Sequence, residues 1–127
     1  MRAIVLRELG GPEKLQTETI PDPTLGPEEV LIRLKAAALN HRDVGIRTGR
    51  YAGIKLPIIL GSDGAGGVVE AGAEVDRAFQ GRPVVIYPAM NWGSDDKAPG
   101  PGFKILGLPD NGTYAQLIKV PVTHAFP

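Results

Sequence analysis

Two clusters of polar residues carry the side-chain types that could do chemistry in this sequence. The first is Asn40, His41 and Asp43, and the second is Ser62 and Asp63 within a glycine-rich stretch. There is no cysteine, which excludes thiolate catalysis, disulfides and any cysteine-ligated zinc or iron–sulfur site. His41 and Asp43 are two residues apart, so on a helix their side chains point in different directions. The spacing therefore argues against a histidine–aspartate relay.

The glycine-rich stretch at 61–67 invites comparison with a nucleotide-binding loop. A dinucleotide loop needs G-x-G-x-x-G between a strand and a helix, but Val69 stands where the third glycine would be. The segment that follows is β-branched and typical of a strand, and the lysine and Ser/Thr pair of a P-loop is absent. The glycines therefore predict tight bends and close strand packing at a barrel corner.

The elements that position these residues follow from the turn residues. With 17 Gly and 12 Pro among 127 residues, the chain has roughly twice their usual share of about 12%. These residues separate short runs rich in Val and Ile, as turns separate strands. Strands are predicted at 2–6, 15–20, 29–35, 67–70, 82–87 and 113–120, and a short helix at 40–48 with Asn40 as its N-cap. The fold class is mainly β, a barrel or sandwich.

Several smaller expectations follow from the same pattern. In 29–35, alternation places Val30, Ile32 and Leu34 on one face and Leu31, Arg33 and Lys35 on the other. Residues 88–112 form a long loop rich in Gly and Pro. The pattern predicts that Trp92, Tyr87 and Phe103 pack this loop, that Asp95, Asp96 and Lys97 form a solvated turn, and that His124 lies on the surface.

Charge and hydropathy limit the function classes. The chain has 14 basic and 14 acidic residues, interspersed, and its net charge is zero. This pattern excludes the basic footprint of a nucleic-acid or anionic-membrane binder. No apolar run approaches the roughly 20 residues that span a bilayer, and the first residues lack a signal-peptide plan. We expect one soluble, cytoplasmic domain over residues 1–127.

The order of the motifs resembles the start of the medium-chain dehydrogenase/reductase superfamily. The resemblance rests on EEVLIRLKAAALNHRD (28–43), RTGRY (47–51), LPIILGSDGAGGVVEAG (56–72), GRPVV (81–85) and GTYAQL (112–117). Gly61, Gly66 and Gly72 match the glycines of the zinc alcohol dehydrogenase signature G-H-E-x-x-G-x-x-x-x-x-G. The resemblance implies a GroES-like β-barrel with one or two short helices. It also implies an incomplete catalytic domain, because the Rossmann domain that binds NAD(P) in this family is not among these residues.

The chain departs from the zinc enzymes at the metal positions. Asn40 stands where those enzymes carry a zinc-ligating Cys, Ser62 replaces the His of G-H-E, and Asp63 replaces its Glu. Amide and hydroxyl groups are poor zinc ligands, and the 88–112 region lacks the four cysteines of a structural zinc site. We therefore expect no metal. The pattern resembles the zinc-independent quinone and enone reductases.

The resemblance implies roles for the polar clusters. The catalytic candidates are Asn40, Tyr51, Ser62 and Asp63, and the residues expected to contact the nicotinamide cofactor are Asn40, His41 and Asp43. Structural alternatives stay open: Asn40 also suits a helix cap, the Tyr51 ring could pack over its loop, and His41 could be purely structural.

The implied reaction is hydride transfer from NADPH or NADH to a quinone or conjugated enone, a small-molecule substrate. Without a Lewis acid, a conjugated carbonyl still spreads the incoming charge, so positioned hydrogen bonds can suffice. Two alternatives remain, a zinc-free alcohol or sugar dehydrogenase and a non-enzymatic GroES-like binding or assembly module. Because strand edges are left uncovered, a homo-oligomer is also expected.

Overall fold

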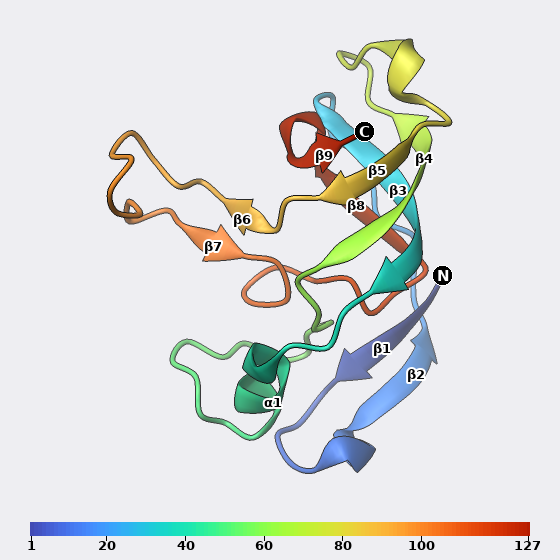
Figure 1. Cartoon of the computed structure of the whole chain (residues 1–127). Coiled ribbons are helices and arrows are strands. Elements are labelled where there is room, and N and C mark those ends of the chain that lie inside the picture. The colour runs from blue at the N-terminus through green and yellow to red at the C-terminus, as the bar shows by residue number, and fades with distance from the viewer.

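A curled five-stranded antiparallel sheet dominates the computed structural model, which describes all residues 1–127 (Figure 1). Its strand order is β8-β3-β4-β5-β9, and β1 and β2 form a separate ribbon beside it. The strands are β1 Arg2–Leu6, β2 Leu15–Thr19, β3 Glu29–Ala37, β4 Gly64–Ala71, β5 Pro83–Ile86, β6 Ala89–Met90, β7 Lys104–Ile105, β8 Leu117–Pro121 and β9 Ala125–Phe126. The helix α1 is His41–Arg47, and 3-10 turns occupy Pro12–Lys14, Arg77–Phe79 and Val122–His124. The mainly β fold and the short helix are confirmed.

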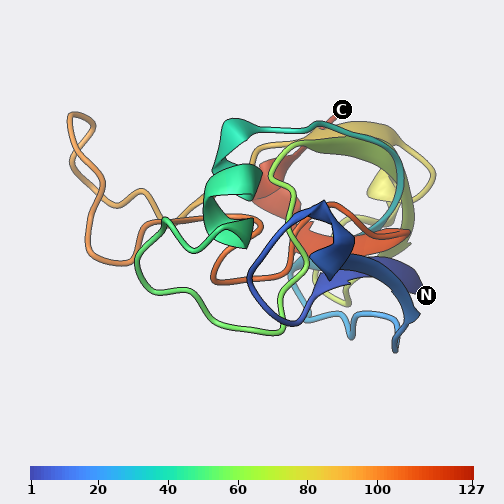
Figure 2. The same cartoon turned by 90° about the horizontal axis from the view of Figure 1, so that it is seen from below.

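The curl of the sheet is visible from below, where β3, β4 and β5 bend around the core (Figure 2). Eleven buried residues fill the concave side, among them Val30, Ile32, Val68 and Val120. A second cluster holds Ile46 of α1 against Leu6 and Leu60. Ile46 is fully buried, so this second cluster fixes the helix against β1 and the segment that leads into β4. The helix has seven residues, and no helix here is long and apolar enough to cross a membrane.

Glycine packing explains why β4 begins earlier than expected. The sequence predicts a strand only at 67–70, but β4 starts at Gly64 and its register runs along β3 from Ala37 onwards. A side chain at Gly66 would collide with the backbone carbonyl of Arg33. The glycines therefore allow close strand packing, as the sequence predicts.

Two strand predictions need correction. Leu31 was expected on the outer face of 29–35, but it is buried together with Val30 and Ile32. Three successive buried residues show that both faces of β3 are covered at this point, and the pairing with β4 has a bulge here in which Val69 is the extra residue. The last long strand begins at Leu117 and not at Thr113, because Thr113 and Tyr114 donate their backbone N–H groups to the 60–61 segment.

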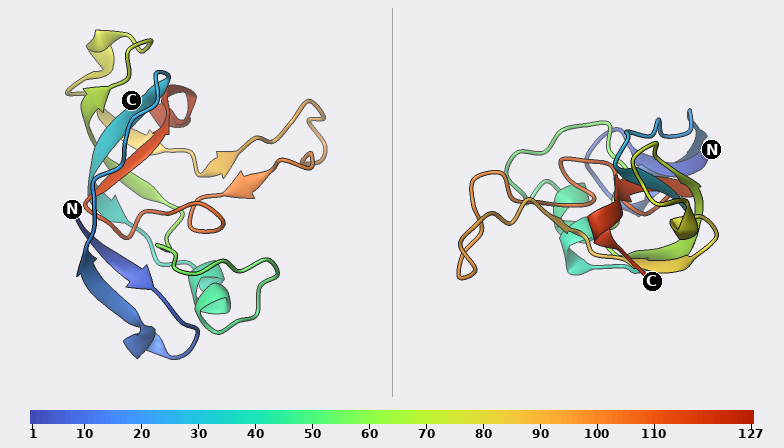
Figure 3. Two further views of the ribbon diagram at one scale, coloured as in Figure 1. Left: turned by 180° about the vertical axis from the view of Figure 1, so that it is seen from behind. Right: turned by 90° about the horizontal axis from the view of Figure 1, so that it is seen from above.

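The long 88–112 segment forms an arm with its own short ladder of β6 and β7. The arm stands away from the sheet when it is seen from behind and from above (Figure 3). Trp92 and Phe103 pack edge-to-face at 5.2 Å, as expected, and the Lys97 N–H bonds the Asp95 side chain in an exposed turn. Tyr87 packs elsewhere, stacked on His124. His124 is half-buried, with Nε2 3.1 Å from the Ala89 carbonyl, so its expected place on the surface is wrong.

Candidate functional site

The two polar clusters of the sequence meet at the start of α1. Asn40 occupies the N-cap position in extended backbone geometry, and its N–H donates to Asp43 Oδ2 at 3.0 Å. The Asn40 side chain points to the other cluster, where Nδ2 donates to Asp63 Oδ2 at 2.8 Å. Asn40 and Asp63 thus form a hydrogen-bonded pair, called here the Asn40–Asp63 pair. The pair joins residues that lie 23 positions apart.

The loop that carries Asp63 is held by all three buried polar side chains of the chain, Asp43, Ser62 and Thr113. Asp43 Oδ1 accepts the Gly61 N–H at 3.0 Å, and Thr113 Oγ1 donates to the Asp63 carbonyl at 2.9 Å. Ser62 Oγ donates to the Leu106 carbonyl at 2.9 Å. Buried polar groups satisfied in this way specify one geometry, so the Asp63 side chain leaves from a fixed backbone.

The Asp43 carboxylate makes its hydrogen bonds within the domain. Its two oxygens accept from the N–H groups of Gly61 and Asn40 and from the Tyr114 hydroxyl at 2.9 Å. Burial, reinforced by the hydrogen bond to Asp43, raises the pKa of Tyr114 well above its usual value, so the phenol stays protonated and donates. The role of Asp43 in cofactor contact stays a prediction, and its contacts favour holding helix and loop together.

Arg42 is a residue that the sequence analysis missed. Its Nη1 donates to the Leu106 carbonyl at 3.0 Å and contacts Ser62 Oγ at 3.4 Å, and its Nη2 donates to the Leu108 carbonyl at 2.9 Å. No carboxylate lies within ion-pair distance of it. The guanidinium therefore ties α1 to the base of the arm. Its carbonyl partners are more than 60 positions away, so no local pattern indicated them.

The side chains of the remaining predicted residues, Tyr51 and His41, make no hydrogen bond to the Asn40–Asp63 pair. The Tyr51 ring is 43% exposed and lies 5.8 Å from the Arg42 guanidinium. The ring also covers Gly45, where a side chain would collide with it. Tyr51 therefore packs against α1. His41 is exposed on the first turn of α1, and its imidazole makes no hydrogen bond.

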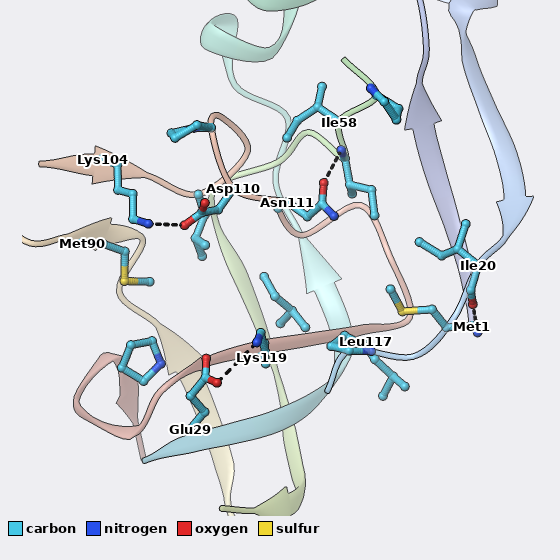
Figure 4. A pocket seen from close by; sticks show the side chains of 18 of the residues that line it. Met1, Ile20, Glu29, Ile58, Met90, Lys104, Asp110, Asn111, Leu117 and Lys119 are labelled. Carbon is cyan, nitrogen blue, oxygen red and sulfur yellow. Dashed lines mark hydrogen bonds and ion pairs between the residues drawn. The ribbon is translucent and has the colours of Figure 1, made fainter. Parts of the chain in front are cut away.

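A large cavity lies away from these residues. It measures about 700 Å³ and is lined by Met1, Ile58 and Asn111 among others (Figure 4). Its polar groups are paired internally, Lys119 with Glu29 at 3.4 Å, Lys104 with Asp110, and Asn111 with the Ile59 N–H. A smaller hollow of about 270 Å³ borders Asp63, with Ala36, Ala37, Ala38 and Val85 in its wall. The candidate site is the Asn40–Asp63 pair beside this smaller hollow.

The donors at the positions where the resemblance places the ligands of the zinc enzymes do not fit zinc. They are the amide of Asn40, the hydroxyl of Ser62 and one carboxylate, that of Asp63, whereas zinc takes thiolate, imidazole and carboxylate groups. Ser62 is buried and donates its hydroxyl to Leu106, and the Asn40 amide nitrogen already binds Asp63. Nowhere in the chain do three His, Cys, Asp or Glu side chains converge as metal ligands would.

Known proteins share this fold and much of this sequence. Residues 26–127 match the family described as alcohol dehydrogenase GroES-like domain. An NAD-dependent alcohol dehydrogenase of Saccharolobus solfataricus is 35% identical over an alignment of 137 residues in length. The alignment covers 95% of this chain and 38% of the relative. A quinone oxidoreductase of Pseudomonas aeruginosa is 33% identical over 118 residues, 87% of this chain and 34% of the relative.

A crystal structure of an NAD-dependent alcohol dehydrogenase superimposes with a TM-score of 0.92 at 41% identity. The match covers 100% of this chain and 39% of that one, so these 127 residues span well under half the length of such relatives. The curled sheet, the short helix and the family match agree with one another. The chain belongs to the alcohol dehydrogenase GroES-like domain family, within the zinc-type alcohol dehydrogenase-like superfamily of oxidoreductases.

Proposed function

We propose that this domain is the substrate side of an NAD(P)H-dependent oxidoreductase that reduces quinones or conjugated enones without zinc. The observation that carries the proposal is the Asn40–Asp63 pair, because it supplies an oriented amide at the position where the superfamily resemblance implies a metal ligand. The similarity to a quinone oxidoreductase supports the same class of reaction.

The amide of Asn40 is the group best placed to stabilise developing charge. One of its two N–H bonds points to Asp63, which leaves the other to donate to a substrate carbonyl oxygen. Asp63 fixes the amide orientation and, as a carboxylate acceptor, polarises it. A donor held in place before the reaction stabilises an oxygen that gains negative charge, without reorganisation.

The polar groups at the start of α1 also fit the nicotinamide end of a dinucleotide. The Asn40 amide and the exposed His41 imidazole both offer hydrogen bonds to a ring carboxamide, whereas Asp43 is already engaged. A bound NAD(P)H would supply the hydride. No G-x-G-x-x-G unit between a strand and a helix occurs in these residues, so they hold only that end of the cofactor.

Grafting tests the proposal directly. The 127 residues replace the matched part of the alcohol dehydrogenase that superimposes at a TM-score of 0.92, and the chimera is assayed with NADPH and NADH. We expect reduction of quinones or enones in chelator-treated protein that contains no zinc. Turnover of simple alcohols alone, or activity that appears only with about one zinc per chain, would contradict the proposal.

A further inference from the structure

Two adjacent hydroxyl side chains, those of Thr113 and Tyr114, contact both halves of the candidate site. Thr113 Oγ1 donates to the Asp63 carbonyl at 2.9 Å. The Tyr114 hydroxyl donates to Asp43 Oδ2 at 2.9 Å and lies 3.0 Å from the Ala38 carbonyl. These partners precede the two residues by 50 to 76 positions in the chain. The two side chains therefore connect the end of β3, the start of α1 and the loop that carries Asp63.

The backbone of the same segment lies directly against this loop. The N–H groups of Gly112, Thr113 and Tyr114 donate to backbone carbonyls within 59–61, at 2.7, 3.0 and 3.1 Å. A side chain at Gly112 would collide with the Gly61 carbonyl, so the two backbones touch with no side chain between them. A side chain at Gly61, which has a φ of +95°, would collide with Thr113 Oγ1. The two hydroxyl groups are thus fixed relative to the loop.

Asp43 connects Tyr114 to Asn40. Its Oδ2 accepts both the Tyr114 hydroxyl and the Asn40 N–H, at 2.9 and 3.0 Å, and its Oδ1 accepts the Gly61 N–H. Asp43 is buried, so bulk water does not replace a donor that is lost there. Without the phenol hydroxyl, Oδ2 would keep one donor, the Asn40 N–H. Tyr114 therefore restrains the backbone from which the Asn40 amide leaves.

The Asp63 end of the pair is held from two sides as well. The Asp63 carbonyl accepts the Thr113 hydroxyl and the Ala38 N–H, the latter at 3.3 Å. None of these hydrogen bonds uses the side-chain atoms that join the pair, Asn40 Nδ2 and Asp63 Oδ2. Thr113 and Tyr114 therefore fix where the two side chains start and leave the second N–H of the Asn40 amide free.

We propose that Thr113 and Tyr114 are positioning residues of the Asn40–Asp63 pair. Gly112 allows the close approach, and the two hydroxyl groups hold the backbone on either side of the pair, so that the amide keeps one orientation. Catalytic groups need to lie within about 0.5 Å of their productive geometry, and a displacement of ~1 Å can cost roughly 10²-fold in rate. The consequence for catalysis rests on the proposed function, whereas the effect on the Asn40 amide does not.

Nuclear magnetic resonance of the 127-residue chain tests the positioning without any reaction. The side-chain NH2 group of Asn40 is observed after isotope labelling of asparagine, and Asn40→Ala assigns its signal. We expect the proton that binds Asp63 to be protected from exchange with water. Tyr114→Phe and Thr113→Val should each lower this protection by roughly fivefold, because each removes one supporting hydrogen bond.

Two matched variants control for the loss of a hydroxyl group elsewhere. Tyr87→Phe alters an exposed phenol that stacks on His124, and Thr48→Val alters a hydroxyl at the far end of α1. Both should keep the protection of the Asn40 amide, and circular dichroism checks that every variant is folded. Full protection in folded Tyr114→Phe and Thr113→Val, or an equal loss in the controls, would overturn the proposal.

Kinetics of the chimera test the consequence for catalysis. Tyr114→Phe should lower kcat for an enone by about tenfold and leave KM nearly unchanged, because the donor is displaced and not removed. Thr113→Val should act in the same way, and Thr113→Ser, which keeps the hydroxyl, should restore the rate. In combination with Asn40→Ala, Tyr114→Phe should add little, since the amide that it positions is then absent.

The outcomes separate the positioning from the proposed function. If the effects of Asn40→Ala and Tyr114→Phe multiply, Tyr114 acts on the domain as a whole and the positioning role is wrong. If the unsubstituted chimera reduces no enone, the proposed function fails, and the exchange of the Asn40 amide still decides whether Thr113 and Tyr114 position it.

Discussion

At the scale of single residues, the Asn40–Asp63 pair makes the sharpest prediction about activity. In the chimera described above, Asn40→Ala should lower kcat/KM for an enone on the order of 10²-fold, because it removes the donor to the developing oxyanion. Asp63→Asn keeps a hydrogen bond but loses the charge that orients the amide, so its effect should be smaller. Thr48→Ala, at the far end of α1, is the control. Unchanged kinetics for Asn40→Ala would refute the assignment.

A substitution at Tyr51 can distinguish a packing role of the ring from a chemical role of its hydroxyl. Tyr51→Phe keeps the ring over Gly45 and beside Arg42 and removes only the phenol hydroxyl. If the hydroxyl donates a proton to the enolate, the variant lowers kcat of the chimera, while the melting temperature of the domain stays unchanged. Equal activity of the two proteins would assign Tyr51 to packing alone.

Tyr114 makes a prediction about stability and pH. Its pKa is raised in the folded state by burial and by Asp43, whereas a phenol in the unfolded chain ionises near pH 10. The neutral phenol is favoured by folding, so its contribution is fully present below about pH 10 and is lost as the pH rises above that value. Urea unfolding between pH 8 and pH 11 should show this fall. Tyr114→Phe should be less stable at neutral pH by about 1 kcal/mol and should show a shallower alkaline decline.

At the scale of elements, the connection between α1 and the base of the arm depends on Arg42. Arg42→Met removes the guanidinium donors of the Leu106 and Leu108 carbonyls, so that Leu106 keeps only the Ser62 hydroxyl and Ser62 loses its contact with Nη1. We expect a loss of about 2 kcal/mol of unfolding free energy, because half-buried acceptors lose charge-assisted bonds. Faster amide exchange at residues 105–108 should accompany it.

Arg47→Met is the matched control for Arg42. Arg47 lies on the same helix and also donates to a backbone carbonyl, that of Gly10, but on the side of the β1–β2 ribbon. It should cost some stability and leave amide exchange at 105–108 unchanged. If both variants loosen 105–108 alike, the connection to the arm does not run through Arg42.

The elements were the part of the structure best predicted from sequence, and the reason is that their signals are local. The N-cap at Asn40 and the β-branched run at Val84, Val85 and Ile86 act within a few residues of themselves. The start of β4 was missed because Gly66 has low strand propensity, and only the close approach to Arg33 explains it. Likewise, the burial of Leu31 was missed because alternation along one strand does not reveal what covers its second face, which is a tertiary feature.

The sequence indicated which residues form the candidate site, but it did not indicate the hydrogen bonds that join them. The sequence singled out Asn40, Ser62 and Asp63 separately, but the bond from Asn40 to Asp63 and the clamp by Arg42 join segments brought together only by the fold. The hydrogen bonds of Asp43 show the same limit, while its assignment to the cofactor stays a prediction. An aspartate in the first turn of a helix looks available in sequence, and only the structure reveals the three donors that surround it.

At the scale of the whole molecule, the last prediction concerns what 127 residues can do alone. The chain carries an oriented amide and a hollow beside it, but no segment in it combines a strand, a glycine turn and a helix to bind a dinucleotide. We therefore expect the isolated chain to show no turnover of NADPH or NADH with quinones or enones. The same chain within the chimera should turn over, and Asn40→Ala should remove most of that activity. The comparison holds the domain constant and changes only the cofactor platform, so a clear rate from the isolated chain would show that it binds the dinucleotide through a surface other than α1.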